Sequence, residues 1–148
     1  MQPVPPPNTT MADGGNYGDV AYWNGNIYTT GQSYPLSQFQ ISNGALTTPQ
    51  FAQSTNIFPP RGGIPAVSSS GASNGIVWII DYSGWNAHTP AILDAYDATN
   101  VSKMLYSSPT SGSGAAASAV KFTVPTVANG KVYVGGGNSF TVFGLLPN

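Results

Sequence analysis

Residues 122–137, FTVPTVANGKVYVGGG, contain two short apolar stretches separated by Asn129 and Gly130. Asn-Gly is the preferred central pair of a type I′ hairpin turn, because both residues tolerate positive φ. The stretch therefore predicts one strand, a two-residue turn and a second strand.

The same pattern occurs twice earlier, in DVAYWNGNIYTTG at 19–31 and in IPAVSSSGASNGIVWIID at 64–81. When the copies are aligned on their Asn-Gly pairs, each continues with a β-branched residue followed by an aromatic one: Ile27-Tyr28, Val77-Trp78 and Val132-Tyr133. The copies recur about every 50 residues, which indicates a structural repeat.

Further strands are expected after each hairpin. Third strands are predicted at LSQFQI (36–41), ILDAYD (92–97) and SFTVFGL (139–145), and fourth strands at ALTTPQF (45–51) and MLYSS (104–108). Four-stranded units at this period are typical of β-propeller blades, whereas an antiparallel sandwich is the alternative. We predict an all-β chain, a single β-propeller domain with about three four-stranded blades, at approximately 14–54, 60–108 and 118–146.

A family resemblance supports this fold. The segments PAILDAYDATNVSKMLYSS (90–108) and AVKFTVPTVANGKVYVGGGNSFTVFGLLPN (119–148) resemble the last blades of bacterial PQQ-like (quinoprotein-type) β-propeller repeat proteins, whose blades close on L-x-A-x-D-A. The resemblance covers residues 16–146 and implies a fold rather than a function. Leu105-Tyr106 stand where such a blade commonly has its Trp, and there is no matching set of quinone-binding residues, so PQQ is not expected.

Three blades are too few to close a ring, because propellers have about four to eight. The chain is therefore expected to be the carboxy-terminal part of a longer propeller, or to form a six-bladed ring as a homodimer. In the dimer, each chain's amino-terminal segment can supply the outer strand that its own last blade, or that of the partner, lacks.

The charge content excludes some partners. Only 6% of the 148 residues are charged, the net charge is −1 and there is no Glu. Nucleic acid is not an expected partner, since phosphate binding needs clustered Lys and Arg. No apolar run is long enough to span a membrane, and the amino terminus lacks the pattern of a signal peptide. The absence of Cys fits either compartment, but the low charge and the many Ser, Thr, Asn and Gly residues are common in secreted bacterial proteins, so we expect a soluble protein whose parent is periplasmic or secreted.

Candidate ligand-binding residues lie just before the first strand of each repeat. The alignment places Asn16, Arg61 and Lys121 at one position, followed by Tyr17, Gly62 and Phe122. In a propeller these segments open at one mouth of the central channel. The pattern therefore predicts a cationic rim with aromatic walls that binds a small anionic ligand. In the alternative, Arg61 hydrogen-bonds loop carbonyls after Pro59-Pro60.

The loop DYSGWNAHTP (81–90) is expected at the same mouth. It contains Asp81, Trp85 and His88, the only histidine. Asp81 and His88 are candidates for a general base with its orienting carboxylate, or for two ligands of a divalent metal. The alternative is a surface loop in which Trp85 packs on a neighbouring blade. Asp19, which is expected to begin the first strand of its repeat, would add a carboxylate near the channel.

Two functions remain open. The first is a domain that binds a small ligand or a protein partner at the channel mouth, without chemistry of its own. The second is a hydrolase of esters, lactones or phosphotriesters, in which Arg61 and Lys121 stabilise an oxyanion and His88 or Asp81 acts as base or metal ligand. Tyr17 and Trp85 would then hold the leaving group. Asp94 and Asp97 are expected to have structural roles.

Overall fold

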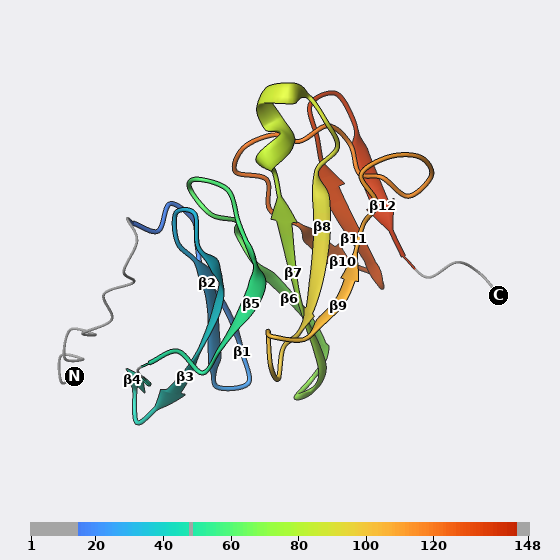
Figure 1. Ribbon diagram of the computed structural model, residues 1–148. Helices are drawn as coiled ribbons and strands as arrows, with labels where there is room; N and C mark the ends of the chain where they lie inside the picture. The colour runs from blue at the N-terminus through green and yellow to red at the C-terminus, as the bar shows by residue number, and fades with distance from the viewer. Residues whose placement is uncertain (1–14, 48, 145–148) are drawn as a thin grey trace.

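The computed structural model describes residues 15–47 and 49–144 and is all-β, with three antiparallel sheets (Figure 1). The first sheet contains β1 (Ala21–Trp23), β2 (Asn26–Thr30), β3 (Pro35–Ser42), β4 (Ala45–Leu46) and β5 (Ala52–Ile57). Strands β1, β2 and β3 are adjacent in chain order, and β4 and β5 both pair with β3.

The other two sheets are simple antiparallel meanders. The second contains β6 (Ala66–Ser70), β7 (Ser73–Asp81), β8 (Ile92–Asp97) and β9 (Met104–Ser107), with the 3₁₀ helix η1 (Ser83–Ala87) between β7 and β8. The third contains β10 (Thr126–Ala128), β11 (Lys131–Gly135) and β12 (Phe140–Phe143). The predicted third strand at 92–97 is confirmed with its exact bounds.

Two of the three predicted Asn-Gly turns are confirmed. Asn24 and Gly25 have φ values of 45° and 78°, and Asn129 and Gly130 have values of 51° and 69°. Both residues of each pair therefore have the positive φ that a type I′ turn requires. Asn43 and Gly44 form a further turn of this kind between β3 and β4, with φ values of 52° and 77°.

The predicted turn at Asn74-Gly75 is wrong. Ser70 pairs with Ser73, so Gly71 and Ala72 form the turn, and Asn74 and Gly75 lie inside β7. Gly75 is needed for packing, because a Cβ atom there would lie 2.8 Å from the indole ring of Trp23. The glycine therefore allows the first and second sheets to approach closely.

The fourth strand of the first sheet also differs from the prediction. Of the described residues in 45–51, only Ala45–Leu46 form a strand, and the longer strand beside β3 is Ala52–Ile57. This strand, AQSTNI, is polar, and its Ser54 and Asn56 face buried polar groups rather than an apolar core. A polar strand of this kind carries no apolar alternation that sequence reasoning could detect.

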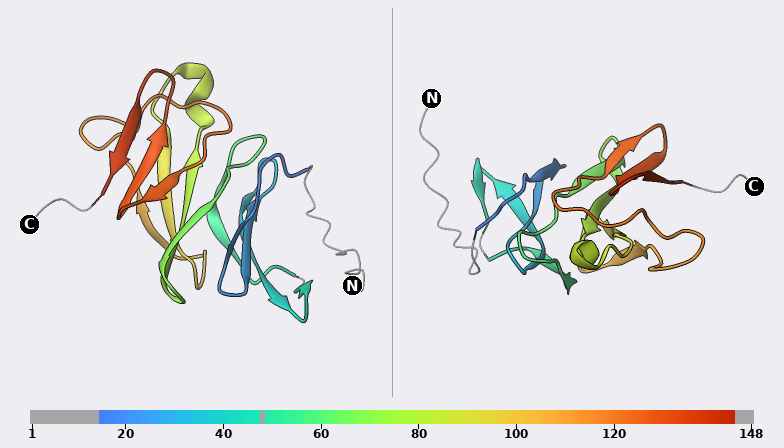
Figure 2. Two further views of the ribbon diagram at one scale, coloured as in Figure 1. Left: turned by 180° about the vertical axis from the view of Figure 1, so that it is seen from behind. Right: turned by 90° about the horizontal axis from the view of Figure 1, so that it is seen from above.

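The three sheets are stacked side by side, with the second between the other two (Figures 1 and 2). One buried cluster joins the first and second sheets and includes Tyr28, Leu36, Val77 and Ile79. Another joins the second and third sheets and the segment before β10, with Ile80, Leu93, Val132 and Val134 among its members. The first strands of the sheets are neighbours, since β6 contacts both β1 and β10. The three sheets do not close into a ring.

Buried hydrogen bonds connect the first two sheets. The Tyr28 hydroxyl donates to the Ala98 carbonyl over 2.6 Å, and the Val101 N–H donates to Oε1 of Gln38 over 3.1 Å. Burial raises the pKa of Tyr28, which keeps this hydroxyl protonated as a donor. A shift of one sheet against the other would leave these buried polar groups unpaired, which is costly. The bonds therefore fix the position of the first sheet relative to the second.

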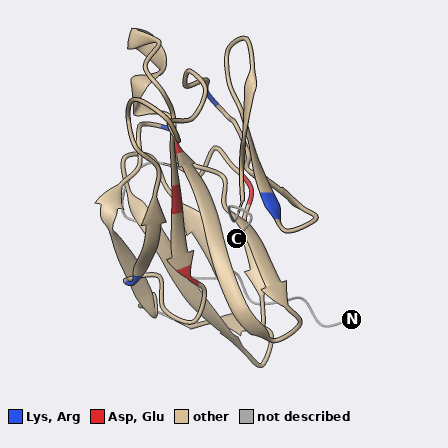
Figure 3. Cartoon of the chain, turned by 90° about the vertical axis from the view of Figure 1, so that its right-hand side faces the viewer, with Lys and Arg blue, Asp and Glu red and all other residues tan. Residues whose placement is uncertain are grey.

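Charged residues are sparse along the described chain, as the few coloured positions of the cartoon show (Figure 3). The helical content of the described residues includes no segment of the length and hydropathy that would cross a bilayer.

Candidate functional site

Three segments, each leading into the first strand of a sheet, contribute one side chain to a common cluster. The guanidinium carbon of Arg61 lies 5.7 Å from the centroid of the Tyr17 ring and 5.9 Å from that of Phe122. These distances are within the range of a cation–π interaction. The structure thus brings together three residues that the repeat alignment placed at neighbouring positions.

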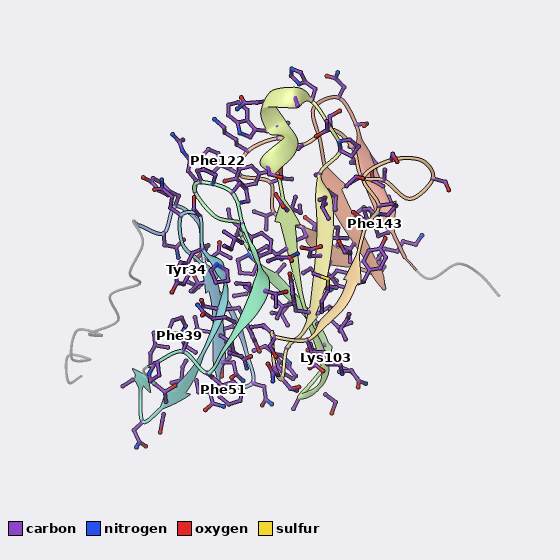
Figure 4. The ribbon with its side chains drawn as sticks, viewed as in Figure 1. Tyr34, Phe39, Phe51, Lys103, Phe122 and Phe143 are labelled. Atoms are coloured by element: carbon purple, nitrogen blue, oxygen red, sulfur yellow. The ribbon has the colours of Figure 1, made fainter. Side chains whose placement is uncertain are left out.

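The cluster is open to solvent. Tyr17 is 56% exposed and Phe122 is 47% exposed, and Arg61 is exposed as well. Figure 4 shows Phe122 at the end of the molecule where η1 lies, whereas Lys103 lies towards the opposite end. The rings and the guanidinium therefore form a surface that a ligand can reach.

The backbone of the cluster is strained at two positions. Arg61 has a φ of 87° and Phe122 a φ of 63°, a region that bulky L-residues rarely adopt. Such residues cost about 1–3 kcal/mol each and persist only where the surroundings hold them. Strain of this kind concentrates at functional sites, which makes the cluster a candidate site.

Several contacts hold the Arg61 loop in place. The Gly62 N–H donates to the Pro59 carbonyl over 2.8 Å, and the Tyr82 hydroxyl donates to the Pro60 carbonyl over 3.1 Å. On the other side of Arg61, the Gly63 N–H donates to Oγ1 of Thr30 over 2.8 Å. Sequence reasoning missed the supporting role of Tyr82, for which the only signal was its place next to Asp81.

Burial raises the pKa of the Tyr82 hydroxyl, an effect that the nearby Arg61 charge opposes. Tyr82 therefore stays protonated at neutral pH and remains a donor to the Pro60 carbonyl. The positive charge of Arg61 therefore affects the buried Tyr82 hydroxyl as well as the exposed surface of the cluster.

A second cation lies close by against a third ring. The Nζ atom of Lys121 is 3.2 Å from the centroid of the Trp85 ring. Trp85 belongs to η1 and packs on the core between the second and third sheets, and Lys121 immediately precedes Phe122. The predicted proximity of the 81–90 loop to the segment before β10 is therefore seen at Trp85 and Lys121.

Neither cation is neutralised by a carboxylate within the described residues. The ion pair found there joins Lys103 and Asp97 over 3.2 Å at another part of the surface. Arg61 and Lys121 instead rest on aromatic rings, which leave the guanidinium and ammonium N–H groups available as donors. The cluster can therefore supply positive charge and hydrogen bonds to an anion.

Asp81 and His88 are on the same loop, but they are not joined. Oδ1 of Asp81 accepts a hydrogen bond of 2.7 Å from the Ser83 N–H at the start of η1. His88 ends η1 with a φ of 54° and is exposed. In residues 15–47 and 49–144, no ion pair links the two, and no group of three His, Cys, Asp or Glu side chains is arranged for a metal ion.

The side chains of Asn16 and Asp19 form hydrogen bonds to other residues of the first repeat. The Asn16 amide donates to Oγ1 of Thr29 over 2.7 Å, and its carbonyl accepts from the Gly18 N–H. Asp19 is exposed and accepts from the Val20 N–H over 2.8 Å. The expectation that Asp19 begins the first strand is wrong, because β1 starts at Ala21.

Comparison with known proteins adds no identity: no family model, no curated protein and no solved structure matches the chain.

Proposed function

We propose that this chain is a binding domain for a small anionic molecule, which it holds at the cluster of Tyr17, Arg61 and Phe122. The observation that carries the proposal is the guanidinium of Arg61, which lies 5.7 and 5.9 Å from the centroids of two exposed rings and has no carboxylate partner in the described residues. Lys121 on Trp85 extends the positive surface.

The chemistry of the cluster favours an anion with a planar or aromatic part. Arg presents a rigid fork of N–H donors that matches carboxylate and phosphate oxygens in pairs. The rings of Tyr17 and Phe122 offer faces on which a planar group can stack. A backbone held in one strained conformation limits the ordering that binding requires, which favours affinity.

We also propose that the three sheets are consecutive blades of a β-propeller of the PQQ-like kind. The meander order of the strands, the face-to-face stacking of the sheets and the neighbouring first strands support this fold. A six-bladed ring formed by two chains is part of the same proposal.

Binding is favoured over hydrolysis by the roles that Asp81 and His88 take. Oδ1 of Asp81 is bonded to the Ser83 N–H, and no ion pair orients His88 in the part of the chain that the structure describes. A general base needs an orienting partner within hydrogen-bond reach, and a metal centre needs several converging ligands. We therefore assign no chemical step to this loop.

Isothermal titration calorimetry tests the proposal, with phenyl phosphate and benzoate as anionic probes and benzyl alcohol as the neutral one. We expect saturable binding of at least one anion and none of benzyl alcohol. Arg61→Ala should weaken binding about 10- to 100-fold, the cost of removing hydrogen bonds to a charged group. Lys103→Ala, at the other end of the molecule, is the matched control and should bind normally. Equal binding by the Arg61→Ala variant and the wild-type chain would rule the site out.

A further inference from the structure

An aromatic residue occupies the equivalent position in each of the three sheets, but the three side chains are buried to different extents. Tyr28 of the first sheet is fully buried in the core shared with the second sheet. Trp78 of the second sheet packs on the core shared with the third. Tyr133 of the third sheet is only half-buried, and no further sheet lies against it in the described structure. The third sheet thus presents a face that its two equivalents bury.

This face is largely apolar, although the exposed Lys131 shares it through the alternation of side chains along β11. Tyr133 pairs with Val142, and Gly135 pairs with Phe140, on the side of the sheet opposite to the buried Val132 and Val134. Phe140 is 68% exposed, and Val142 is exposed as well. We call Tyr133, Phe140 and Val142 the last end face.

The first sheet has a partly exposed face of the complementary kind, on which Phe39 is buried and Tyr22 and Ile41 are exposed. Ile27 is equivalent to Val77 and Val132, which are buried against the preceding sheet, yet no sheet precedes Ile27 in the described structure. Tyr22 pairs with Ile27 on this side, and Ile41 lies two residues beyond Phe39, the partner of Ile27 on β3. Tyr22 is 63% exposed. We call Tyr22, Ile27 and Ile41 the first end face.

We propose that the last end face of one chain packs on the first end face of a second copy. The chain already forms this contact twice, where the Tyr28 side of the first sheet meets the Val77 side of the second and where the Trp78 side meets the Val132 side of the third. A second copy offers the same face to Tyr133. The inference rests on the propeller arrangement proposed above.

The two faces are different surfaces, so the contact is head-to-tail. Such contacts close into a ring when the rotation between copies allows it, and otherwise they form open polymers. Three sheets from each of two chains give a closed ring with two identical contacts. The Arg61 clusters of both chains then lie at the same end of the ring.

Light scattering during size-exclusion chromatography tests the assembly. The wild-type chain should have a mass near twice 15.3 kDa. Tyr22→Asp and Phe140→Asp should each produce monomers, because each substitution places a charge in both contacts of the ring. Leu105→Asp, an exposed apolar residue of β9 away from both end faces, is the matched control and should remain dimeric. A wild-type monomer, as expected if a sheet from another protein or a longer chain covers these faces, would overturn the proposal, and so would an open polymer.

Mixing the two variants distinguishes a head-to-tail contact from a symmetric one. A Tyr22→Asp chain retains the last end face and a Phe140→Asp chain retains the first, so together they can form one unaltered contact. We expect a species of about twice the chain mass that neither variant forms alone. Loss of the dimer in only one of the two variants would point instead to pairing of like faces and overturn the proposal. Far-UV circular dichroism confirms that the exposed substitutions leave the fold intact.

The assembly and the proposed ligand site can fail independently. Tyr17, Arg61 and Phe122 come from a single chain, so calorimetry with phenyl phosphate can succeed on a monomer. The solution mass, in turn, requires no ligand.

Discussion

The side-chain amide of Asn56 donates a hydrogen bond of 3.1 Å to Oδ2 of Asp94, which joins β5 of the first sheet to β8 of the second. Asp94 is only 1% exposed, and its other oxygen, Oδ1, has no hydrogen-bond partner. The hydroxyl of Tyr96 lies 3.4 Å from Oδ2 on the same side. A carboxyl group is thus enclosed between two sheets, with hydrogen bonds from Asn56 and Tyr96 to Oδ2 and none to Oδ1 within the described residues, so its ionised form is incompletely bonded.

Burial raises the pKa of Asp94, and the negative charge of Asp81 adds to the effect, although the side chains of Ser107, Asn56 and Tyr96 oppose it. The folded state therefore disfavours the ionised form. Stability is full below the ordinary Asp pKa and falls as the pH rises through the raised value in the folded state.

Asp94→Asn should therefore stabilise the protein at neutral pH, on the order of 1 kcal/mol, because it removes an incompletely bonded buried charge. The gain should vanish at pH values below the ordinary Asp pKa, where Asp94 is neutral in both states. Urea unfolding at several pH values measures this difference. An Asp94→Asn variant that is less stable than wild type at neutral pH would show that the ionised carboxylate is the stabilising form.

Asp97 is a matched control, for which the opposite effect of pH on stability is expected. Hydrogen bonds from the Thr99 hydroxyl and N–H to Oδ1 lower the pKa of Asp97. Its contribution to stability is present above the ordinary Asp pKa and is lost as the pH falls through the lowered value. Asp97→Asn should therefore destabilise the protein at neutral pH, with a loss that disappears in acid.

Gly75→Ala should destabilise the protein by about 1–3 kcal/mol, because the new methyl group would force the Trp23 ring out of its place between the first and second sheets. Gly137→Ala is the control, since a Cβ atom there has no heavy atom within 4 Å. Thermal unfolding of both variants measures the difference. Equal melting temperatures would mean that the contact between Trp23 and β7 is not tightly packed.

Arg61→Gly separates the strain at this position from the role of the side chain. At a φ of 87°, glycine avoids a penalty that alanine retains, so Arg61→Gly should be about 1 kcal/mol more stable than Arg61→Ala. Both variants should lose anion binding to the same extent, because both lack the guanidinium. Chemical denaturation and calorimetry give the two quantities, and equal stabilities would indicate that the loop relaxes to negative φ.

The local part of the fold was predictable from the sequence. Asn24-Gly25 and Asn129-Gly130 form turns because both residues of each pair tolerate positive φ. The strand ILDAYD has the predicted bounds. Repetition of these local signals, rather than the strength of any one of them, indicated three antiparallel sheets.

Contacts between the sheets determine the features of the fold that could not be predicted from the sequence. Gly75 looked like a turn residue, yet it serves the close approach of Trp23, more than 50 positions away in the chain. Strand β5 is polar because it faces Asp94 and its neighbours across a sheet interface. At the candidate site, Tyr17, Arg61 and Phe122 lie together because they occupy neighbouring positions of the repeat. Asp81 and His88 lie on either side of η1, and within the described residues no ion pair joins them.

Nuclear magnetic resonance of the Arg61 side chain tests the central claim most directly. Arg61 is the only arginine in the chain, so its Nε–H group gives a single, unambiguous signal in a ¹⁵N-labelled sample. A saturable shift of this signal on addition of phenyl phosphate, with no change on addition of benzyl alcohol, is the predicted result. An Arg61 signal that stays unchanged while phenyl phosphate is added to saturating concentration would contradict the assignment of this cluster as an anion-binding site.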